Sequence, residues 1–113
     1  MNIPALKSEA AKATVRPARF RVGDAVRVKR LFPIGHVRTP YYCRGKPGVV
    51  ERLCGAFPNP EELAYGRSGL PAQPLYRVRF RMLDLWDDYA GSPLDTTDIE
   101  IYDHWLDAAA ESP

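Results

Sequence analysis

The sequence predicts an all-β fold, a small antiparallel barrel with long loops, and three observations lead to this prediction. Eleven prolines and eight glycines are spread through the 113 residues, which disfavours long helices. Short segments alternate apolar and polar residues with the period of two that a half-buried strand requires. Long irregular segments separate these strands, as they do in small barrels. At this length the chain holds one domain with a single core.

Four segments of the chain are predicted to be strands: residues 25–30, 48–53, 75–80 and 97–102. The third is the clearest, because Tyr, Val and Phe occupy every second position and Leu and Arg the positions between them. A short helical turn is predicted at 60–64, and a turn at 82–86 that buries either Leu85 or Trp86. Residues 103–106 close the domain.

The chain is predicted to consist of a flexible N-terminal arm at 1–19, the barrel domain at 20–107 and a C-terminal tail at 108–113. The arm lacks the continuous apolar core of a secretory signal. No stretch approaches the ~18 consecutive apolar residues that a membrane helix needs. We therefore expect a cytoplasmic protein without a membrane partner.

Charge is distributed unevenly along the chain, although the net charge is only +2. Nine Lys or Arg residues and one acid lie between Arg16 and Lys46, whereas nine acids and no Lys or Arg follow Arg81. This asymmetry fits nucleic-acid binding by the basic half. It fits equally well two halves that pack against each other, or that face different partners. Because no motif of a known nucleic-acid module is present, we expect no nucleic-acid partner.

The segment 31–45 is predicted to be a long shaped loop rich in Tyr and Arg, and long loops on compact domains are usually functional or disordered. Arg44 lies there between aromatic residues and a glycine. Such an arginine can offer its planar guanidinium to an oxyanion, two donors to two oxygens. A solvated surface arginine has the same local sequence, so the residues alone leave both interpretations open.

No motif of a self-contained enzyme is present: neither a GxSxG elbow, nor a phosphate-binding glycine loop, nor a His/carboxylate metal spacing. Cys43 and Cys54 do not form a CxxC pair. We interpret them as small buried hydrophobic residues in a reducing cytosol, with a disulfide or a metal ligand as the alternatives. His104, beside Trp105, is interpreted as a packed surface histidine and not as a catalytic base.

Residues 20–106 resemble the C-terminal barrel of the nitrile hydratase β subunit, and the resemblance depends on four segments in order. These are Phe-x-Val-Gly-Asp with its Val-Arg strand at 20–28, Gly-His-x-Arg and aromatic-x-Arg-Gly-Lys with a Val-Val strand at 35–50, Gly-Ala-Phe at 55–57, and Leu-Tyr-x-Val-x-Phe with Leu-Trp at 75–86. No single segment is specific, but their combined order and spacing is. The resemblance implies a small SH3-like barrel.

The resemblance also implies a function. Nitrile hydratases hydrate a nitrile to an amide at a non-corrin cobalt(III) or non-haem iron(III) centre, held by a Cys-rich loop of the α subunit in which two cysteines are oxidised. Arginines of the β subunit hydrogen-bond to the oxidised sulfurs, and Arg44 matches one of them. Tyr41 and Tyr42 would shape the same wall, and His36 and Arg38 would contact a neighbouring subunit. This chain would bind no metal itself.

Two departures from the family pattern bear on the partners. The chain lacks the helical N-terminal half of an ordinary β subunit and any cysteine loop, so we expect a hetero-oligomer with a Cys-rich α-type subunit and a separate subunit for that N-terminal half. Residues 94–101 and 105–106 resemble the small subunit of thiocyanate hydrolase, so hydrolysis of thiocyanate to carbonyl sulfide and ammonia is an alternative. A non-catalytic SH3-like binding or accessory module is the alternative of another class.

Overall fold

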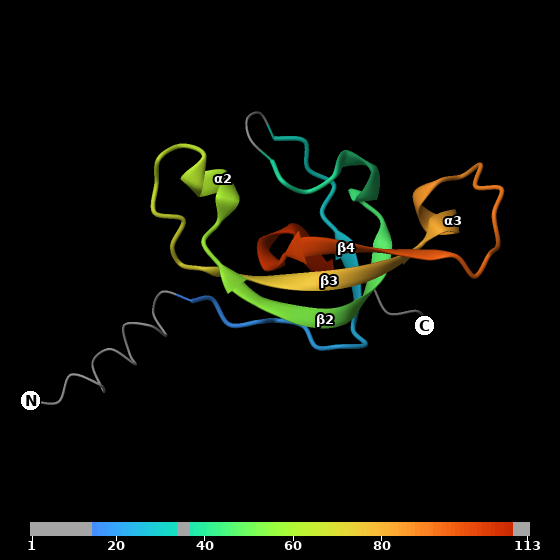
Figure 1. Cartoon of the computed structure of the whole chain (residues 1–113), viewed down its shortest axis with the longest axis horizontal. Helices are drawn as coiled ribbons and strands as arrows, with labels where there is room; N and C mark the ends of the chain where they lie inside the picture. Colours follow the sequence, from blue (N-terminus) through green and yellow to red (C-terminus); the bar gives the residue numbers. More distant parts are fainter. Residues whose placement is uncertain (1–14, 34–36, 110–113) are drawn as a thin grey trace, which may run out of the picture.

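The computed structural model describes residues 15–33 and 37–109, which form one curved antiparallel sheet with short helices in its connections (Figure 1). Five strands pair in the order β4-β3-β2-β1-β5. The strands are β1 (Ala25–Val28), β2 (Pro47–Phe57), β3 (Gln73–Arg81), β4 (Thr96–Tyr102) and β5 (Leu106–Ala108). The short helices are the 3₁₀ turns η1 (Tyr41–Cys43) and η2 (Asp103–Trp105) and the α-helices α2 (Pro60–Leu63) and α3 (Met82–Leu85).

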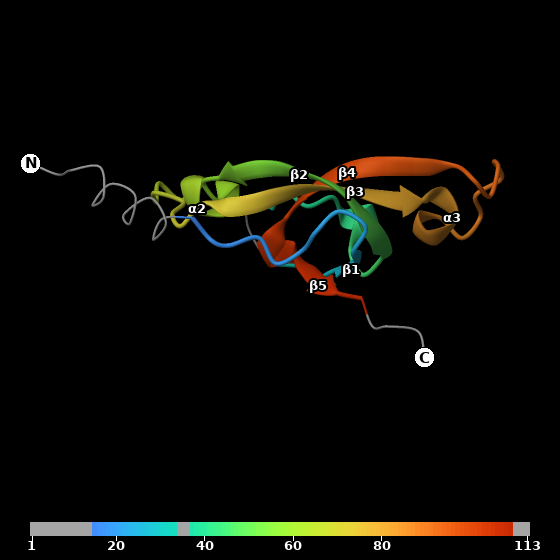
Figure 2. The same cartoon turned by 90° about the horizontal axis from the view of Figure 1, so that it is seen from below.

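The all-β prediction is confirmed, but the barrel is not closed. Strands β2, β3 and β4 form one long layer, and β1 and β5 lie together on one side of it (Figure 2). Of β2, only the first residues, Pro47 to Val49, pair with β1. The rest of β2 continues along β3 as far as Phe57. Within the described residues β4 and β5, which η2 connects, are the two edge strands of the sheet and do not pair.

A single core lies inside the curve of the sheet. The alternation in β3 places Val78 and Phe80 in this core, both fully buried, and leaves Arg79 and Arg81 on the outer face. Burial of each such apolar side chain contributes about 2 kcal/mol. The buried residues of the core are Phe20, Val26, Val28, Cys43, Val50, Tyr76, Val78, Phe80, Leu85, Ile101, Trp105 and Leu106.

The predicted elements are present with small changes of extent. β2 runs past its predicted end at residue 53 as far as Phe57, because two bulges let it follow β3. The predicted helical turn is α2, where the side chain of Asn59 caps the backbone N–H of Glu61. After β3, Leu85 is buried in α3 whereas Trp86 remains 43% exposed. None of the described helices is long and apolar enough to span a membrane.

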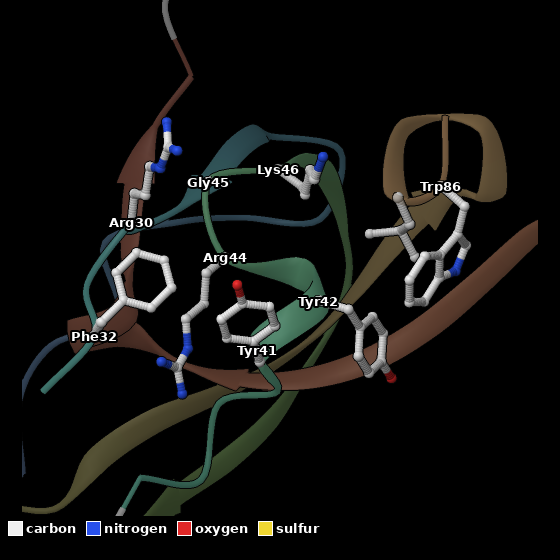
Figure 3. A pocket seen from close by; sticks show the side chains of 9 residues that line it. Arg30, Phe32, Tyr41, Tyr42, Arg44, Gly45, Lys46 and Trp86 are labelled. Atoms are coloured by element: carbon white, nitrogen blue, oxygen red, sulfur yellow. The ribbon is translucent and has the colours of Figure 1, made fainter. Parts of the chain in front are cut away.

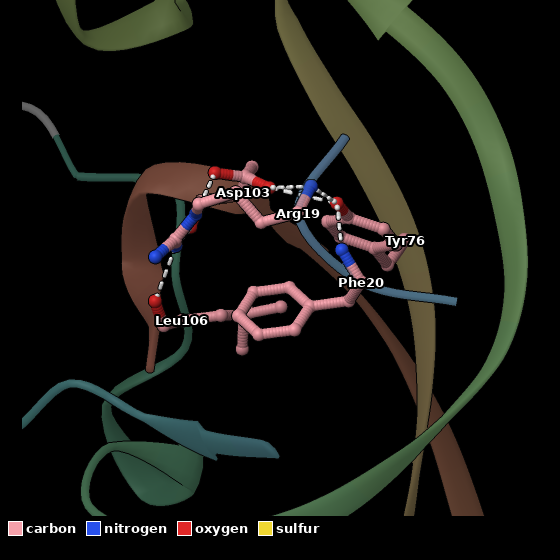
Figure 4. A network of polar contacts seen from close by, with 5 residues as sticks. All are labelled: Arg19, Phe20, Tyr76, Asp103 and Leu106. Carbon is pink, nitrogen blue, oxygen red and sulfur yellow. Dashed lines mark hydrogen bonds and ion pairs between the residues drawn. The ribbon is translucent and has the colours of Figure 1, made fainter. Parts of the chain in front are cut away.

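The segment before β1 is held to the sheet by a buried polar network (Figure 4). The Tyr76 hydroxyl donates to Asp103 Oδ2 at 2.7 Å. It also accepts the backbone N–H groups of Arg19 at 3.0 Å and Phe20 at 3.3 Å. The Arg19 guanidinium donates to Asp103 Oδ1 at 2.8 Å and to the Leu106 carbonyl oxygen at 2.6 Å. Burial, reinforced by the bond to Asp103, raises the pKa of Tyr76 to about 12.

Acidic residues of the C-terminal half meet arginines from earlier in the chain. Arg19 pairs with the buried Asp103, which joins the basic first half of the chain directly to the acidic second half. On the outer face of the sheet, Arg79 bonds to Asp98 at 2.9 Å across β3 and β4. The uneven charge distribution is therefore used, at least in part, to pack the two halves together.

Candidate functional site

A hollow of about 430 Å³ opens between η1, the segment that follows β1, and α3 (Figure 3). Its lining residues are Arg30, Phe32, Tyr41, Tyr42, Arg44, Gly45, Lys46, Leu85 and Trp86. This described lining contains three cationic and four aromatic side chains and no carboxylate. The cations give the hollow a positive potential, so its chemistry suits an anionic group held close to apolar surface.

The turn η1 presents its side chains to the hollow because its last residue is anchored in the core. Cys43 is fully buried, and its thiol donates to the carbonyl oxygen of Pro40 at 3.2 Å. With Cys43 turned inward, its neighbours Tyr42 and Arg44 reach the hollow. Gly45 then takes a φ of +78°, a left-handed conformation that favours glycine, and leads the chain into β2.

The Arg44 side chain is held through its two terminal nitrogens. Nη1 donates to the carbonyl oxygen of Leu31 at 3.1 Å, and Nη2 donates to that of Thr39 at 2.8 Å. The guanidinium carbon lies 5.1 Å from the centroid of the Trp105 ring and 5.6 Å from that of Phe32. A guanidinium has five N–H donors, so these two bonds leave others unused. One of them, at Nε, is buried without a hydrogen-bond partner among the described residues.

Two aromatic pairs border the hollow. Tyr42 stacks on Trp86, with ring centroids 5.4 Å apart, and Phe32 contacts Tyr41 at 5.6 Å. All four rings are more than a third exposed. Exposed aromatic rings around a hollow are typical of a surface that a partner covers, because aromatic side chains are enriched in protein interfaces.

Three of the five residues predicted for the site are brought together. Arg44, Tyr41 and Tyr42 all line the hollow. Arg38 is exposed and is not part of the lining. His36 lies outside the described residues. The contact of Arg38 and His36 with a neighbouring subunit stays a prediction.

Sequence reasoning did not single out Arg30 or Trp86, which line the same hollow. Arg30 ends a predicted strand, and Trp86 lies in a turn for which burial was one expectation. Neither local pattern indicates a site. The one signal for Trp86 was its place in the Leu-Trp segment of the family resemblance, far from Arg44 in the sequence.

The described residues offer no obvious metal centre. Cys43 and Cys54 are both free, and only Cys43 is fully buried. Within residues 15–33 and 37–109, no three His, Cys, Asp or Glu side chains are grouped so that they could hold a metal ion. Cations around the hollow would repel a bare metal ion, and their N–H donors fit anionic oxygens.

Comparison with known proteins identifies the family. Residues 8–108 match the family model described as "Nitrile hydratase beta subunit, C-terminal". The chain therefore belongs to the family formed by the C-terminal domains of nitrile hydratase β subunits. Its relatives include subunits of two kinds of enzyme, nitrile hydratase and thiocyanate hydrolase.

The nitrile hydratase subunit beta of Pseudomonas chlororaphis is 40% identical over 88% of this chain and 47% of the relative. The cobalt-containing nitrile hydratase subunit beta of Pseudonocardia thermophila is 36% identical over 85% of this chain and 39% of the relative. The chain thus spans less than half the length of these relatives.

Thiocyanate hydrolase of Thiobacillus thioparus is also similar. Its subunit alpha is 33% identical over 87% of this chain and 78% of the relative. A solved structure of thiocyanate hydrolase from the same organism, a recombinant apo-enzyme, matches with a TM-score of 0.79 and 28% identity. That match covers 96% of this chain and 98% of the other.

Proposed function

We propose that the chain is a β-type subunit of a nitrile hydratase-like hetero-oligomer, and that Arg44 completes an active site whose metal is held by a Cys-rich α-type subunit. The proposal rests mainly on how the Arg44 side chain is held and on the hydrogen-bond donors that it leaves unused. Its guanidinium is braced by two carbonyl oxygens and an aromatic ring, yet it retains unused N–H donors beside a positively charged hollow.

Arg44 would donate hydrogen bonds to the oxygens of oxidised cysteine ligands. A planar guanidinium offers parallel N–H groups to two oxygens, so it holds their orientation as well as their charge. Arg30 and Lys46 line the same hollow and add to its positive potential. When bound in the partner, cobalt(III) or iron(III) would supply Lewis-acid activation of the substrate. The cobalt-containing relative supports cobalt.

The reaction of the first candidate is the addition of water to a nitrile. The water oxygen forms a bond to the nitrile carbon, and both water hydrogens finish on the nitrogen, which gives an amide. This chain's residues take part by shaping the cavity. Tyr41 and the stacked Tyr42–Trp86 pair would meet the partner and exclude bulk water, which strengthens the hydrogen bonds that Arg44 donates.

A second candidate is the hydrolysis of thiocyanate, in which thiocyanate and two water molecules give carbonyl sulfide, ammonia and hydroxide. The structural match to thiocyanate hydrolase over nearly the whole of both chains favours it. The charge of the hollow also favours it, because Arg30 and Lys46 would attract an anionic substrate, whereas a nitrile is neutral.

The test is reconstitution of the complex from this chain, a Cys-rich α-type subunit and the subunit for the N-terminal half of β. Amide formed from acetonitrile and ammonia formed from thiocyanate are measured on the same preparation. Arg44→Lys keeps the charge but loses the two-donor fork, so we expect turnover to fall about 10- to 100-fold. Arg52→Lys, at an exposed position on β2 outside the hollow, is the matched control.

Wild-type turnover in Arg44→Lys would rule out the proposed role of that residue. A chain that never copurifies with a Cys-rich partner would favour the remaining alternative, a non-catalytic binding or accessory module. The ratio of the two activities in the wild-type complex decides between the two substrates.

A further inference from the structure

Support for Arg44 comes from parts of the chain outside the hollow. The ring of Trp105, in η2, is 3% exposed and lies against the Arg44 guanidinium. Its indole Nε1 donates a hydrogen bond to Glu61 Oε2 at 2.6 Å. Glu61 belongs to α2, in the connection between β2 and β3. Three segments that are far apart in the sequence therefore form one chain of contacts that ends at the site arginine.

We propose that Glu61 is a positioning residue, which fixes the Trp105 ring and through it sets the orientation of the Arg44 guanidinium. This inference rests on the function proposed for Arg44 and extends it to a residue that does not line the hollow. Glu61 would touch neither substrate nor metal; it acts through Trp105.

The geometry explains why the ring is needed. Two hydrogen bonds, from Nη1 to Leu31 O and from Nη2 to Thr39 O, hold the outer end of the Arg44 guanidinium. These two bonds still allow the guanidinium plane to rotate about the line that joins Nη1 and Nη2. The face of the Trp105 ring, 5.1 Å from the guanidinium carbon, limits this rotation and so determines where the second N–H groups of Nη1 and Nη2 point.

The charge of Glu61 makes the contact stronger. A carboxylate that accepts an indole N–H forms a short charge-assisted hydrogen bond, which fixes the ring and increases electron density on its faces. Attraction between a cation and an aromatic face depends on that density and grows when water is excluded. The nearly complete burial of Trp105 satisfies the second condition.

Glu61 is itself held firmly. Its backbone N–H donates to Asn59 Oδ1 at 3.0 Å, the cap of α2. Its second carboxylate oxygen lies 3.2 Å from His104 Nε2. The adjacent Glu62 has a different environment, because its carboxylate pairs with Arg67 at the surface. Glu62 therefore provides a control of the same residue type on the same helix.

The kinetic test uses the reconstituted complex and whichever of acetonitrile or thiocyanate it turns over. We expect Glu61→Ala and Trp105→Phe to lower kcat about 10-fold with KM unchanged. Glu61→Gln keeps an acceptor oxygen for the indole and should recover most of the loss. Glu62→Ala should leave kcat unchanged. An equal loss in Glu62→Ala, or no recovery in Glu61→Gln, would overturn the inference.

A double variant that combines Glu61→Ala with Arg44→Lys distinguishes a positioning role of Glu61 from a role in general stability. If Glu61 acts through Arg44, then Glu61→Ala should cause no further loss of kcat once the guanidinium is absent. Additive losses would show a merely structural role and refute the inference. Wild-type kcat in Glu61→Ala, with a large loss in Arg44→Lys, would refute the positioning role and leave the proposed function intact. Wild-type turnover in Arg44→Lys alone would refute both.

A second readout does not depend on activity. In ¹⁵N–¹H spectra of the full chain, Glu61→Ala should shift both the indole N–H resonance of Trp105 and the Nε–H resonance of Arg44, and Glu61→Gln should shift them less. The indole resonance of Trp86, which has no contact with Glu61, is the internal reference. An Arg44 resonance that is unchanged in Glu61→Ala would contradict the coupling.

Discussion

Removal of the Tyr76 hydroxyl tests how much the buried polar network contributes to stability. Tyr76→Phe deletes one oxygen and keeps the ring, which is fully buried in the core. The variant loses the bond to the Asp103 carboxylate and leaves the buried N–H of Phe20 without its acceptor. Because Asp103 begins η2, the same change loosens the segment that carries Trp105 against the site arginine.

The expected loss in the free energy of unfolding follows from the hydrogen bonds that the Tyr76 hydroxyl makes. A hydrogen bond to a charged group contributes about 2 kcal/mol, and one from a backbone N–H about 1 kcal/mol. The N–H of Arg19 has a second acceptor, Asp103 Oδ2 at 3.3 Å, so its loss is compensated in part. We therefore expect Tyr76→Phe to lower the free energy of unfolding by about 3 kcal/mol, a large share of the ~5–15 kcal/mol typical of a small domain.

Urea denaturation followed by tryptophan fluorescence measures this change. With a slope near ~1.5 kcal/mol/M, the midpoint should fall by about 2 M. Tyr102→Phe is the control, because that ring is also buried but its hydroxyl makes no hydrogen bond with the described residues. A loss below about 1 kcal/mol in Tyr76→Phe, or equal losses in the two variants, would refute this account of the network.

Three further predictions concern ionisation and the partner surface. The unfolded chain releases the Tyr76 proton near pH 10 and the folded chain near pH 12, so stability should fall with rising pH across this interval, and less so in Tyr76→Phe. Burial raises the pKa of Cys43 to about 11. At about pH 8 we therefore expect iodoacetamide to modify Cys54 in the folded chain and Cys43 only after unfolding. Rapid labelling of both cysteines in the folded chain would contradict this prediction. In a binding titration, Trp86→Ala should weaken affinity for the Cys-rich partner about 10-fold. Leu94→Ala, at an exposed loop position, should leave this affinity unchanged. Equal affinities of the two variants for the partner would argue against the aromatic border as the interface.

Much of the fold could be predicted because a half-buried strand requires a local alternation of apolar and polar residues. In β3 the period of two alone places Val78 and Phe80 inside and Arg79 outside, as observed. The extent of β2 could not be predicted in the same way. Its two bulges depend on pairing with β3, and the segment that contains Cys54 continues the strand only because of that pairing.

The site was predictable in part. The density of Tyr and Arg around Arg44 indicated a functional loop, and three of its residues do meet at one hollow. Arg30 and Trp86 could not be found from local patterns. They reach the hollow because β1 and α3 flank η1 in space, and this depends on how the sheet curves.

The sequence by itself determined the all-β class, the order of the strands along the chain and the loop that carries Arg44. These properties are written in short patterns of apolar, charged and turn-forming residues. Only the tertiary structure decided that β4 and β5 leave the barrel open, and that Glu61 and Trp105 lie behind the site arginine. The physical reason is that such contacts join segments far apart in the sequence, and their distances are set by strand register, bulges and curvature, which no single segment encodes.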